Sequence, residues 1–254
     1  MAACKDGHDR VALDLIEAGG EDIDHADVNG WTALMIACVR GHDQCALELI
    51  KAGADLEKPN NNGWTPLMKA CSGGHGHDPC VRVMIEAGAD VNHASAHGRT
   101  ALMEACRNGH DPCALQLIKA GANVNFAKSN GFTALMIACQ GGHDRVALAT
   151  IKAGAKLEAV NNDGFTALMI ACQNGHDSCA LQLIKAGANV DQTDNDGYTP
   201  LMSACQNGNG RVARVMIEAG AGVNKADNDG MTALMMACHR GHDQCALVLL
   251  EAGA

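Results

Sequence analysis

The sequence predicts an all-α solenoid of stacked helix-turn-helix units with projecting turns. A Gly-x-Thr motif opens each unit, and its copies stand 33, 35, 33, 33, 33 and 33 residues apart, at Gly30, Gly63, Gly98, Gly131, Gly164, Gly197 and Gly230. A fixed period in this range is typical of repeat proteins, whose units bury their apolar faces by stacking on one another. Two helix patterns and one turn pattern fill each period.

The first helix pattern follows the motif directly. Thr166 is a predicted N-cap, and the segment ALMIACQ behind it has apolar residues at the three-and-four spacing of a buried stripe. Pro66 and Pro200 follow the corresponding threonines. Proline suits the first helical position because the N–H that it lacks needs no partner there. Gly175 is the predicted end of this helix.

The second helix pattern is SCALQLIKA, for which Asp177 is the predicted N-cap. Pro79 and Pro112 each follow an aspartate at the corresponding position, which agrees with a helix start there. Gly187 is a predicted left-handed C-cap. The remaining segment, ANVDQTDNDG, is rich in Asn, Asp and Gly and predicts the turn that leads to the next unit.

The pattern of Gly-x-Thr-Ala/Pro-Leu, a central Gly-His and a late Ala-Gly-Ala resembles the ankyrin repeat. The resemblance covers a partial unit over residues 1–29 and seven units over residues 30–254, and it implies an ankyrin-repeat solenoid. In that family a histidine braces the turn by hydrogen bonding to the cap threonine. Methionine stands in its place here, so we expect weaker polar bracing, at Met35, Met68, Met103, Met136, Met169, Met202 and Met235.

The composition of the chain indicates which classes of partner it can bind and in which compartment we expect it. The chain has 19 Lys and Arg against 29 Asp and Glu, a net charge of -10, which argues against nonspecific binding to nucleic acid or anionic membranes. No apolar run approaches the roughly 20 residues of a membrane helix. The first residues already match the repeat, so no targeting peptide is predicted. We expect a cytoplasmic protein, with a nuclear location as the alternative.

Cysteine recurs near the end of the first helix and the start of the second. Valine replaces it at Val11, Val146 and Val212, which favours a small apolar packing role. Cys38 and Cys45 have six residues between them, unlike the shorter spacing of zinc knuckles. We therefore predict no metal and no cofactor, with metal or redox use as the alternative. No phosphate-binding loop or nucleophile motif is present, so catalysis is not predicted.

One variable position stands out between the Gly and Thr of each opening motif. It holds five of the six aromatic residues of the chain, in the series Trp31, Trp64, Arg99, Phe132, Phe165, Tyr198 and Met231. The ankyrin resemblance implies that this position lies at the base of the turn, on the concave side. Aromatic residues, Arg and Met are enriched at protein interfaces. The alternative is that the rings stack on neighbouring turns and only stiffen the array.

The first helix adds further variable positions on the same side. The second and third units are charged there and the fourth and fifth are apolar, a division that suits an amphipathic or extended peptide. The alternative is that the charges are ordinary solvated residues. The predicted partner-binding residues are Trp31, Trp64, Lys69, Arg99, Glu104, Arg107, Phe132, Ile137, Phe165, Ile170, Tyr198 and Met231.

These patterns predict a non-catalytic scaffold that binds another protein or a peptide segment. The alternative is a structural subunit or spacer, natural or designed, that docks end to end, because the last helix is unusually apolar, with Val248 where Gln182 stands in an internal unit.

Two irregular units are expected to differ in structure from the other units. The second has extra residues that should bulge at Gly73–His77, and the sixth, QNGNGRV, lacks the usual His and Asp and should be looser.

Overall fold

The computed structural model describes residues 22–73 and 78–254, which form fourteen α-helices and no β-strand. They divide into two compact units: unit 1 ends at Asn123, and unit 2 comprises residues 124–254. In both, helices alternate with turns as a helix-turn-helix solenoid requires, which confirms the predicted fold class. Most of the predicted partial unit lies outside the described residues, and so do the inserted residues after Gly73. Among the described residues, no helix has both the length and the apolar character to cross a membrane.

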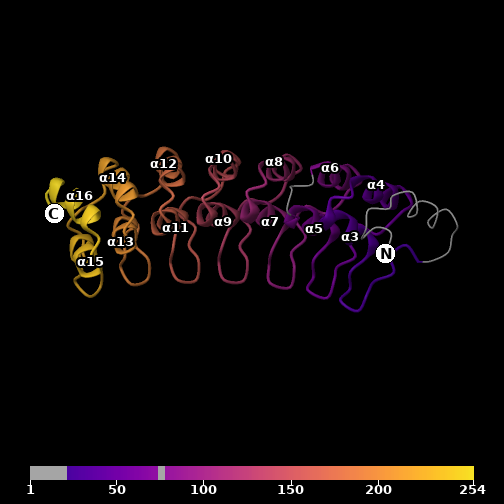
Figure 1. The fold of residues 1–254 in the computed structure, drawn as a ribbon, viewed down its shortest axis with the longest axis horizontal. Helices are drawn as coiled ribbons and strands as arrows, with labels where there is room; N and C mark the ends of the chain where they lie inside the picture. The colour runs from indigo at the N-terminus through magenta and orange to yellow at the C-terminus, as the bar shows by residue number, and fades with distance from the viewer. Residues whose placement is uncertain (1–21, 74–77) are drawn as a thin grey trace. The chain divides into compact units, whose positions relative to one another are not determined.

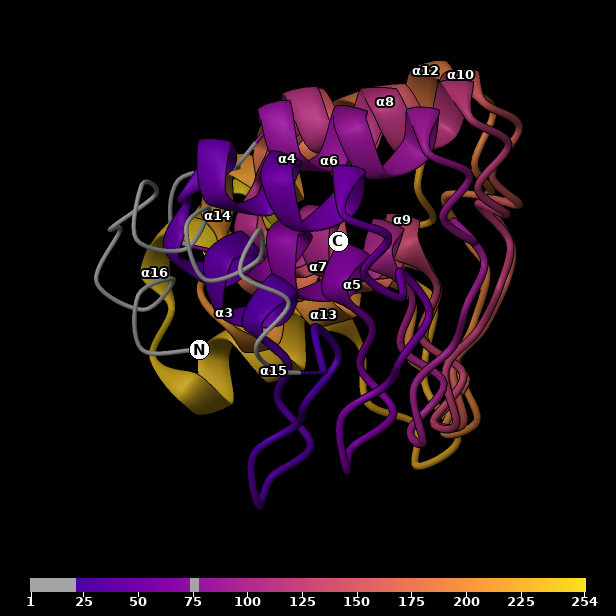
Figure 2. The same ribbon diagram turned by 90° about the vertical axis from the view of Figure 1, so that its right-hand side faces the viewer.

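The described residues of unit 1 form three helix pairs. The first helices α3, α5 and α7 pack on one another in succession, and the second helices α4, α6 and α8 do the same. Figure 2 shows the second helices lying over the first helices, with the turns projecting from the opposite side. The helices are α3 (Ala33–Arg40), α4 (Asp43–Lys51), α5 (Pro66–Ser72), α6 (Asp78–Glu86), α7 (Ala101–Asn108) and α8 (Asp111–Lys119).

Unit 2 repeats this arrangement with four pairs. Its first helices are α9 (Ala134–Gly141), α11 (Ala167–Asn174), α13 (Pro200–Gln206) and α15 (Ala233–Arg240). Its second helices are α10 (Asp144–Lys152), α12 (Asp177–Lys185), α14 (Gly210–Glu218) and α16 (Asp243–Glu251). Each helix packs on its counterpart in the next pair, and in Figure 1 the turns of this unit hang below the first helices.

Every described first helix begins at the predicted threonine cap. In each, the threonine Oγ1 accepts the backbone N–H of the methionine three residues later; the Thr199 bond measures 3.2 Å. This bond satisfies one of the N–H groups that the first turn of a helix leaves without an intrahelical partner. At the other end of α11, Gly175 adopts a left-handed conformation with φ of 75°, as predicted for a helix C-cap.

The methionines do more than the sequence predicted. In three pairs of unit 2 the methionine Sδ accepts the backbone N–H of the cap threonine, at 3.5 Å for Met136 and Met169 and 3.4 Å for Met202. Threonine and methionine thus bond to each other reciprocally, in the geometry of a capping box. A thioether is a weak acceptor, so the methionine occupies the bracing position at these turns through a weak polar bond.

The predicted aspartate cap of the second helix is wrong. Asp177 is the first residue of α12, and its Oδ1 accepts only the N–H of the next residue, Ser178, at 3.0 Å; the histidine before it is the N-cap and makes no side-chain capping bond. Two aspartates at this position bond to a thiol of the next pair. Asp43 Oδ1 accepts the thiol of Cys80 at 2.9 Å, and Asp144 Oδ1 accepts the thiol of Cys179 at 3.0 Å. The carboxylate also suits the positive end of the helix dipole.

The cysteines are packing residues, as predicted. Eleven of the twelve described cysteines are buried, and Cys238 is the exposed one; Cys4 lies outside the described residues. Burial raises the pKa of the Cys71 and Cys172 thiols well above their ordinary value of 9.0, so both stay protonated. Within residues 22–73 and 78–254, no group of three or more His, Cys, Asp or Glu is placed to hold a metal ion.

The turn of the sixth repeat has its own hydrogen bonds. Asn209 stands where other repeats have histidine, and its Nδ2 donates to the carbonyls of Cys172 and Gln173, both at 2.9 Å. Gly210 begins α14 and is buried. In the other second helices whose N-cap is described, the N-cap is a histidine that makes no side-chain capping bond, so the lack of aspartate here gives no reason for a looser joint.

Candidate functional site

The projecting turns fix the variable residues that the sequence singled out. In the sixth repeat, the Tyr198 N–H donates to Asp194 Oδ1 at 2.8 Å, and the Asp194 N–H donates to the Tyr198 carbonyl at 3.1 Å. Asp194 Oδ1 also accepts the Asp196 N–H at 3.0 Å. These bonds hold Tyr198 at the base of the turn, directly before the cap threonine. We call the residues at this position the finger column: Trp31, Trp64 and Arg99 in unit 1, and Phe132, Phe165, Tyr198 and Met231 in unit 2.

The same locked turn recurs along the chain. An Asn or Asp four residues before the column residue accepts its backbone N–H at Trp31, Trp64, Phe165 and Met231. Neighbouring turns are also joined through the backbone, for example by the Asn228 N–H, which donates to the Asp196 carbonyl at 3.0 Å. Successive column residues are therefore held beside one another within each unit.

In unit 1 the column is combined with charge. The Lys69 ammonium lies 4.2 Å from the ring centroids of both Trp31 and Trp64, between two faces that attract a cation. Desolvation by burial lowers the pKa of Lys69, and the negative charge of Glu104 opposes that shift. Arg99 Nη1 donates to Glu104 Oε1 at 2.9 Å in an ion pair whose side chains are 29% and 3% exposed.

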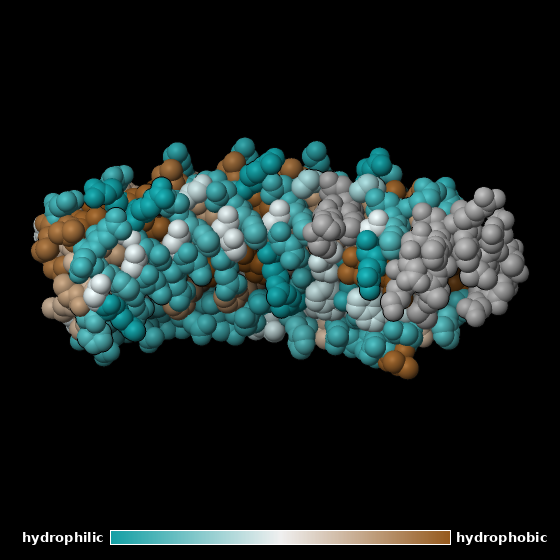
Figure 3. Space-filling view, in the orientation of Figure 1, coloured by the Kyte–Doolittle hydropathy of each residue, from teal (hydrophilic) through white to brown (hydrophobic). Residues whose placement is uncertain are grey.

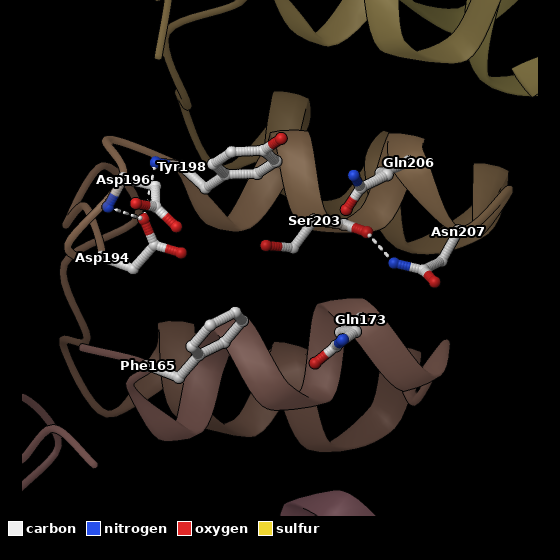
Figure 4. A pocket seen from close by; sticks show the side chains of 8 residues that line it. All are labelled: Phe165, Gln173, Asp194, Asp196, Tyr198, Ser203, Gln206 and Asn207. Atoms are coloured by element: carbon white, nitrogen blue, oxygen red, sulfur yellow. Dashed lines mark hydrogen bonds between the residues drawn. The ribbon is translucent and has the colours of Figure 1, made fainter. Parts of the chain in front are cut away.

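In unit 2 the column is mostly apolar. The four column side chains are half-buried, and so is Ile137 on α9. The Lys128 ammonium lies 4.9 Å from the ring centroid of Phe132. Between the rings of Phe165 and Tyr198 is a hollow of about 200 Å³ with polar side chains along its other walls. Figure 4 shows the two rings on opposite sides of this hollow.

The predicted contact residues differ in accessibility. Glu104 and Ile170 are both buried, so they support the column from beneath and present little surface to a partner. Arg107 is exposed, and the other predicted contacts are half-buried. Sequence reasoning missed Asp194 and Asp196 as lining residues of the hollow. The signal was present: two acidic residues precede Tyr198, where Asn60 and Asn62 precede Trp64.

A second apolar surface lies on the last helix pair. Met235 is 51% exposed, whereas its counterpart Met136 is fully buried, because the first helix of the next repeat covers α9 and no further first helix of the described chain covers α15. Leu247 and Leu250 on α16 are also exposed, and Figure 3 shows apolar residues gathered at this end. Val248, which marked this end in the sequence, is buried. We call Met235, Leu247 and Leu250 the end surface.

Comparisons with known proteins agree with this architecture. A family model described as ankyrin repeats (3 copies) matches residues 1–95, 59–128, 75–161, 102–194 and 176–254. The crystal structure of the human ASB11 ankyrin repeat domain is similar, with a TM-score of 0.81 and 25% sequence identity over 88% of this chain and 99% of that one. A search of curated proteins gave no significant match. Together, the repeated motif, the helix pairs and the family match show that the chain belongs to the ankyrin repeat family.

Proposed function

We propose that the chain is a non-catalytic scaffold that binds a protein or peptide segment through the finger column and the adjoining first-helix residues, on the concave face. Ankyrin repeats are generally protein–protein interaction modules, and their fold is generally non-catalytic. The observation that carries the proposal is the placement of the aromatic residues. Five of the six stand in one half-buried column that turn hydrogen bonds hold in place.

The core does not require aromatic residues in the column. Arg99 and Met231 occupy it in other repeats, and the largest fully buried side chains are leucines and methionines of the helices. Half-exposed rings that are already fixed offer contact area at a small cost in conformational entropy. The alternative role of the rings is to stiffen the array by stacking on neighbouring turns. That role does not require rings that keep part of their surface exposed to solvent.

The two units differ in the chemistry that they offer a partner. Unit 1 has Lys69 beside its two tryptophans and also carries Arg99 and the exposed Arg107, and unit 2 presents mainly apolar rings. An extended or amphipathic peptide is a suitable occupant for such a surface. Nucleic acid is not, because the net charge of -10 opposes it.

A pair of matched variants tests the proposal. We expect Phe132→Ala with Phe165→Ala to weaken capture of the native partner from cell extract by several kcal/mol, because aromatic hot spots contribute about 2 kcal/mol or more each. The control is Leu148→Ala with Leu181→Ala, which removes two exposed apolar side chains from the second helices α10 and α12. Circular dichroism must show both variants folded. Equal capture by wild type and the column variant would contradict the proposal.

End docking is a second candidate, and the end surface favours it. In internal repeats of unit 2, the next first helix covers the counterparts of Met235. A helix pair of the same kind is therefore the occupant that this surface fits. If Met235→Lys with Leu250→Lys abolishes capture while the column variant keeps it, end docking replaces the column as the mode of binding.

We also propose that the scaffold works in the cytoplasm or the nucleus. The support is that no disulfide joins any of the twelve described cysteines and that eleven of them are buried, a state that reducing compartments maintain. A fluorescent fusion of the full chain, followed in living cells, tests this location.

A further inference from the structure

The space between successive column residues is filled differently in the two units. The side chains of two successive column residues enclose a slot. Beside this slot stands a residue of the first helix, five positions after the later of the two column residues. In unit 1 the slot between Trp31 and Trp64 holds the chain's own cation: the Lys69 ammonium is 4.2 Å from both ring centroids. Lys69 shows that a slot with two aromatic walls can hold an ammonium group; between Phe132 and Phe165 the corresponding residue is the apolar Ile170.

In unit 2 the slot between Phe165 and Tyr198 is open. The residue that corresponds to Lys69 is Ser203, whose short side chain turns back and donates its hydroxyl to the Thr199 carbonyl at 3.2 Å. The hollow left between the rings measures about 200 Å³, far more than the roughly 10–15 Å³ that one water needs. Figure 4 shows Ser203 beside the open space between the rings.

Larger side chains stand at the corresponding position of other repeats. Ile170 follows Phe165 by five residues, Met236 follows Met231 in the same way, and Glu104 follows Arg99. All three are buried, at 2%, 4% and 2% exposure. Ser203 is therefore the small residue at a position where its counterparts are large.

The rim of the open slot is negatively charged. Asp194 and Asp196 line it, where the corresponding residues of the Trp64 turn are the neutral Asn60 and Asn62. No hydrogen bond or ion pair from any described residue reaches the Asp196 carboxylate. The other polar lining groups are amides and the hydroxyls of Ser203 and Tyr198, and none of the lining residues is cationic.

We propose that the slot between Phe165 and Tyr198 binds the ammonium group of a lysine side chain on the partner protein. The proposal rests on the proposed scaffold function and names the chemistry of one contact in it. Two ring faces attract the cation, the Asp194 and Asp196 carboxylates add attraction, and the amide oxygens of Gln173 and Gln206 can accept its N–H donors. The partner supplies in unit 2 the group that Lys69 supplies in unit 1.

A small probe tests the slot without the partner. The full chain, labelled with ¹⁵N, is titrated with n-butylammonium chloride and separately with n-butanol at matched ionic strength. We expect saturable shifts of the Tyr198 and Ser203 amide signals with the ammonium, and at least about fivefold weaker binding of the neutral alcohol.

Variants separate the slot from other surfaces. Ser203→Lys should fill it with an internal ammonium and abolish the shifts, and Ser203→Ala, the matched control, should keep them. Tyr198→Leu keeps apolar bulk but removes one ring face, so it should weaken binding severalfold even if Ser203→Lys fails to fold. Equal affinity for the alcohol, or unchanged binding by folded Ser203→Lys or by Tyr198→Leu, would overturn the proposal.

The result is independent of the test of the scaffold function. If the slot ignores the ammonium but Phe132→Ala with Phe165→Ala still loses the partner, the column binds protein through other chemistry. If the slot binds the ammonium and that column variant captures the partner normally, the scaffold proposal fails and the slot remains as a local cation site.

Discussion

The buried ion pair of unit 1 gives the sharpest stability prediction. Arg99→Met removes the partner of Glu104 and puts at the column position a side chain that this column already contains, at Met231. The Glu104 side chain is 3% exposed, so its carboxylate would lose its closest cation while still shielded from water. We expect the variant to be less stable than wild type.

The magnitude follows from the geometry. At the 2.9 Å separation of Arg99 Nη1 and Glu104 Oε1, and an effective dielectric constant of about 20, the attraction is about 6 kcal/mol before desolvation. Arg99 is 29% exposed, which screens the pair, and Lys69 stays within electrostatic reach of Glu104 in the variant. We therefore expect a loss of about 3 kcal/mol, the lower end of the range for breaking a buried pair.

Tryptophan fluorescence during urea unfolding is a suitable assay. The chain has two tryptophans, Trp31 and Trp64, and both lie in unit 1, so the signal reports the unit that contains the ion pair. A loss of 3 kcal/mol should lower the urea midpoint by about 1 M or more. The control is the double variant Arg99→Met with Glu104→Met, which copies the residues at Met231 and Met236.

The double variant decides whether the reasoning is right. Replacing both members of a buried ion pair with apolar residues is often neutral or stabilising, so stability should return to near the wild-type value. Two results would contradict this reasoning. One is a free energy of unfolding for Arg99→Met within about 0.5 kcal/mol of the wild-type value, and the other is a double variant less stable than Arg99→Met. Either would mean that the arginine does not stabilise the protein through the buried charge of Glu104.

Three further predictions concern other parts of the chain. Asn209→Ala should lose about 1–3 kcal/mol and speed amide exchange in the α13–α14 turn, because two carbonyl bonds disappear; unchanged exchange would contradict this. In native, reduced protein, Cys238 should be alkylated before the other described cysteines, and a chelator should leave the melting temperature unchanged; peptide mass spectrometry and a melting curve check both. Burial raises the pKa of the Cys71 and Cys172 thiols, so their contribution to stability should be lost as the pH rises through the ordinary value of 9.0, where only the unfolded thiols ionise; stability that rises from pH 9 to 10 would refute this.

The fold was predictable because the sequence pattern of each helix and turn recurs in several units. Thr166, Gly175 and Gly187 mark helix ends with residue types whose backbone roles are narrow, and the same types recur at the same spacing in other units. One doubtful signal could therefore be checked against its copies. Repetition also made the variable column visible, since a position that changes among constant neighbours is easy to find.

The errors arose where a side chain had two competing partners. Asp177 has the residue type of an N-cap, but its position is one residue too late, and related aspartates bond to thiols of the next pair. The methionine braces depend on a sulfur position that sequence does not reveal. The open slot depends on Ser203 turning back to its own helix, a choice made by packing.

The methionine braces have a consequence for how the turns respond to acid. An imidazole at that position would titrate near its usual pKa of about 6.5, so each brace would change charge as the solution is acidified. The sulfur of Met136, Met169 or Met202 has no proton to gain in that range and keeps accepting the threonine N–H. The threonine–methionine bonds beneath Phe132, Phe165 and Tyr198 thus do not respond to mild acid.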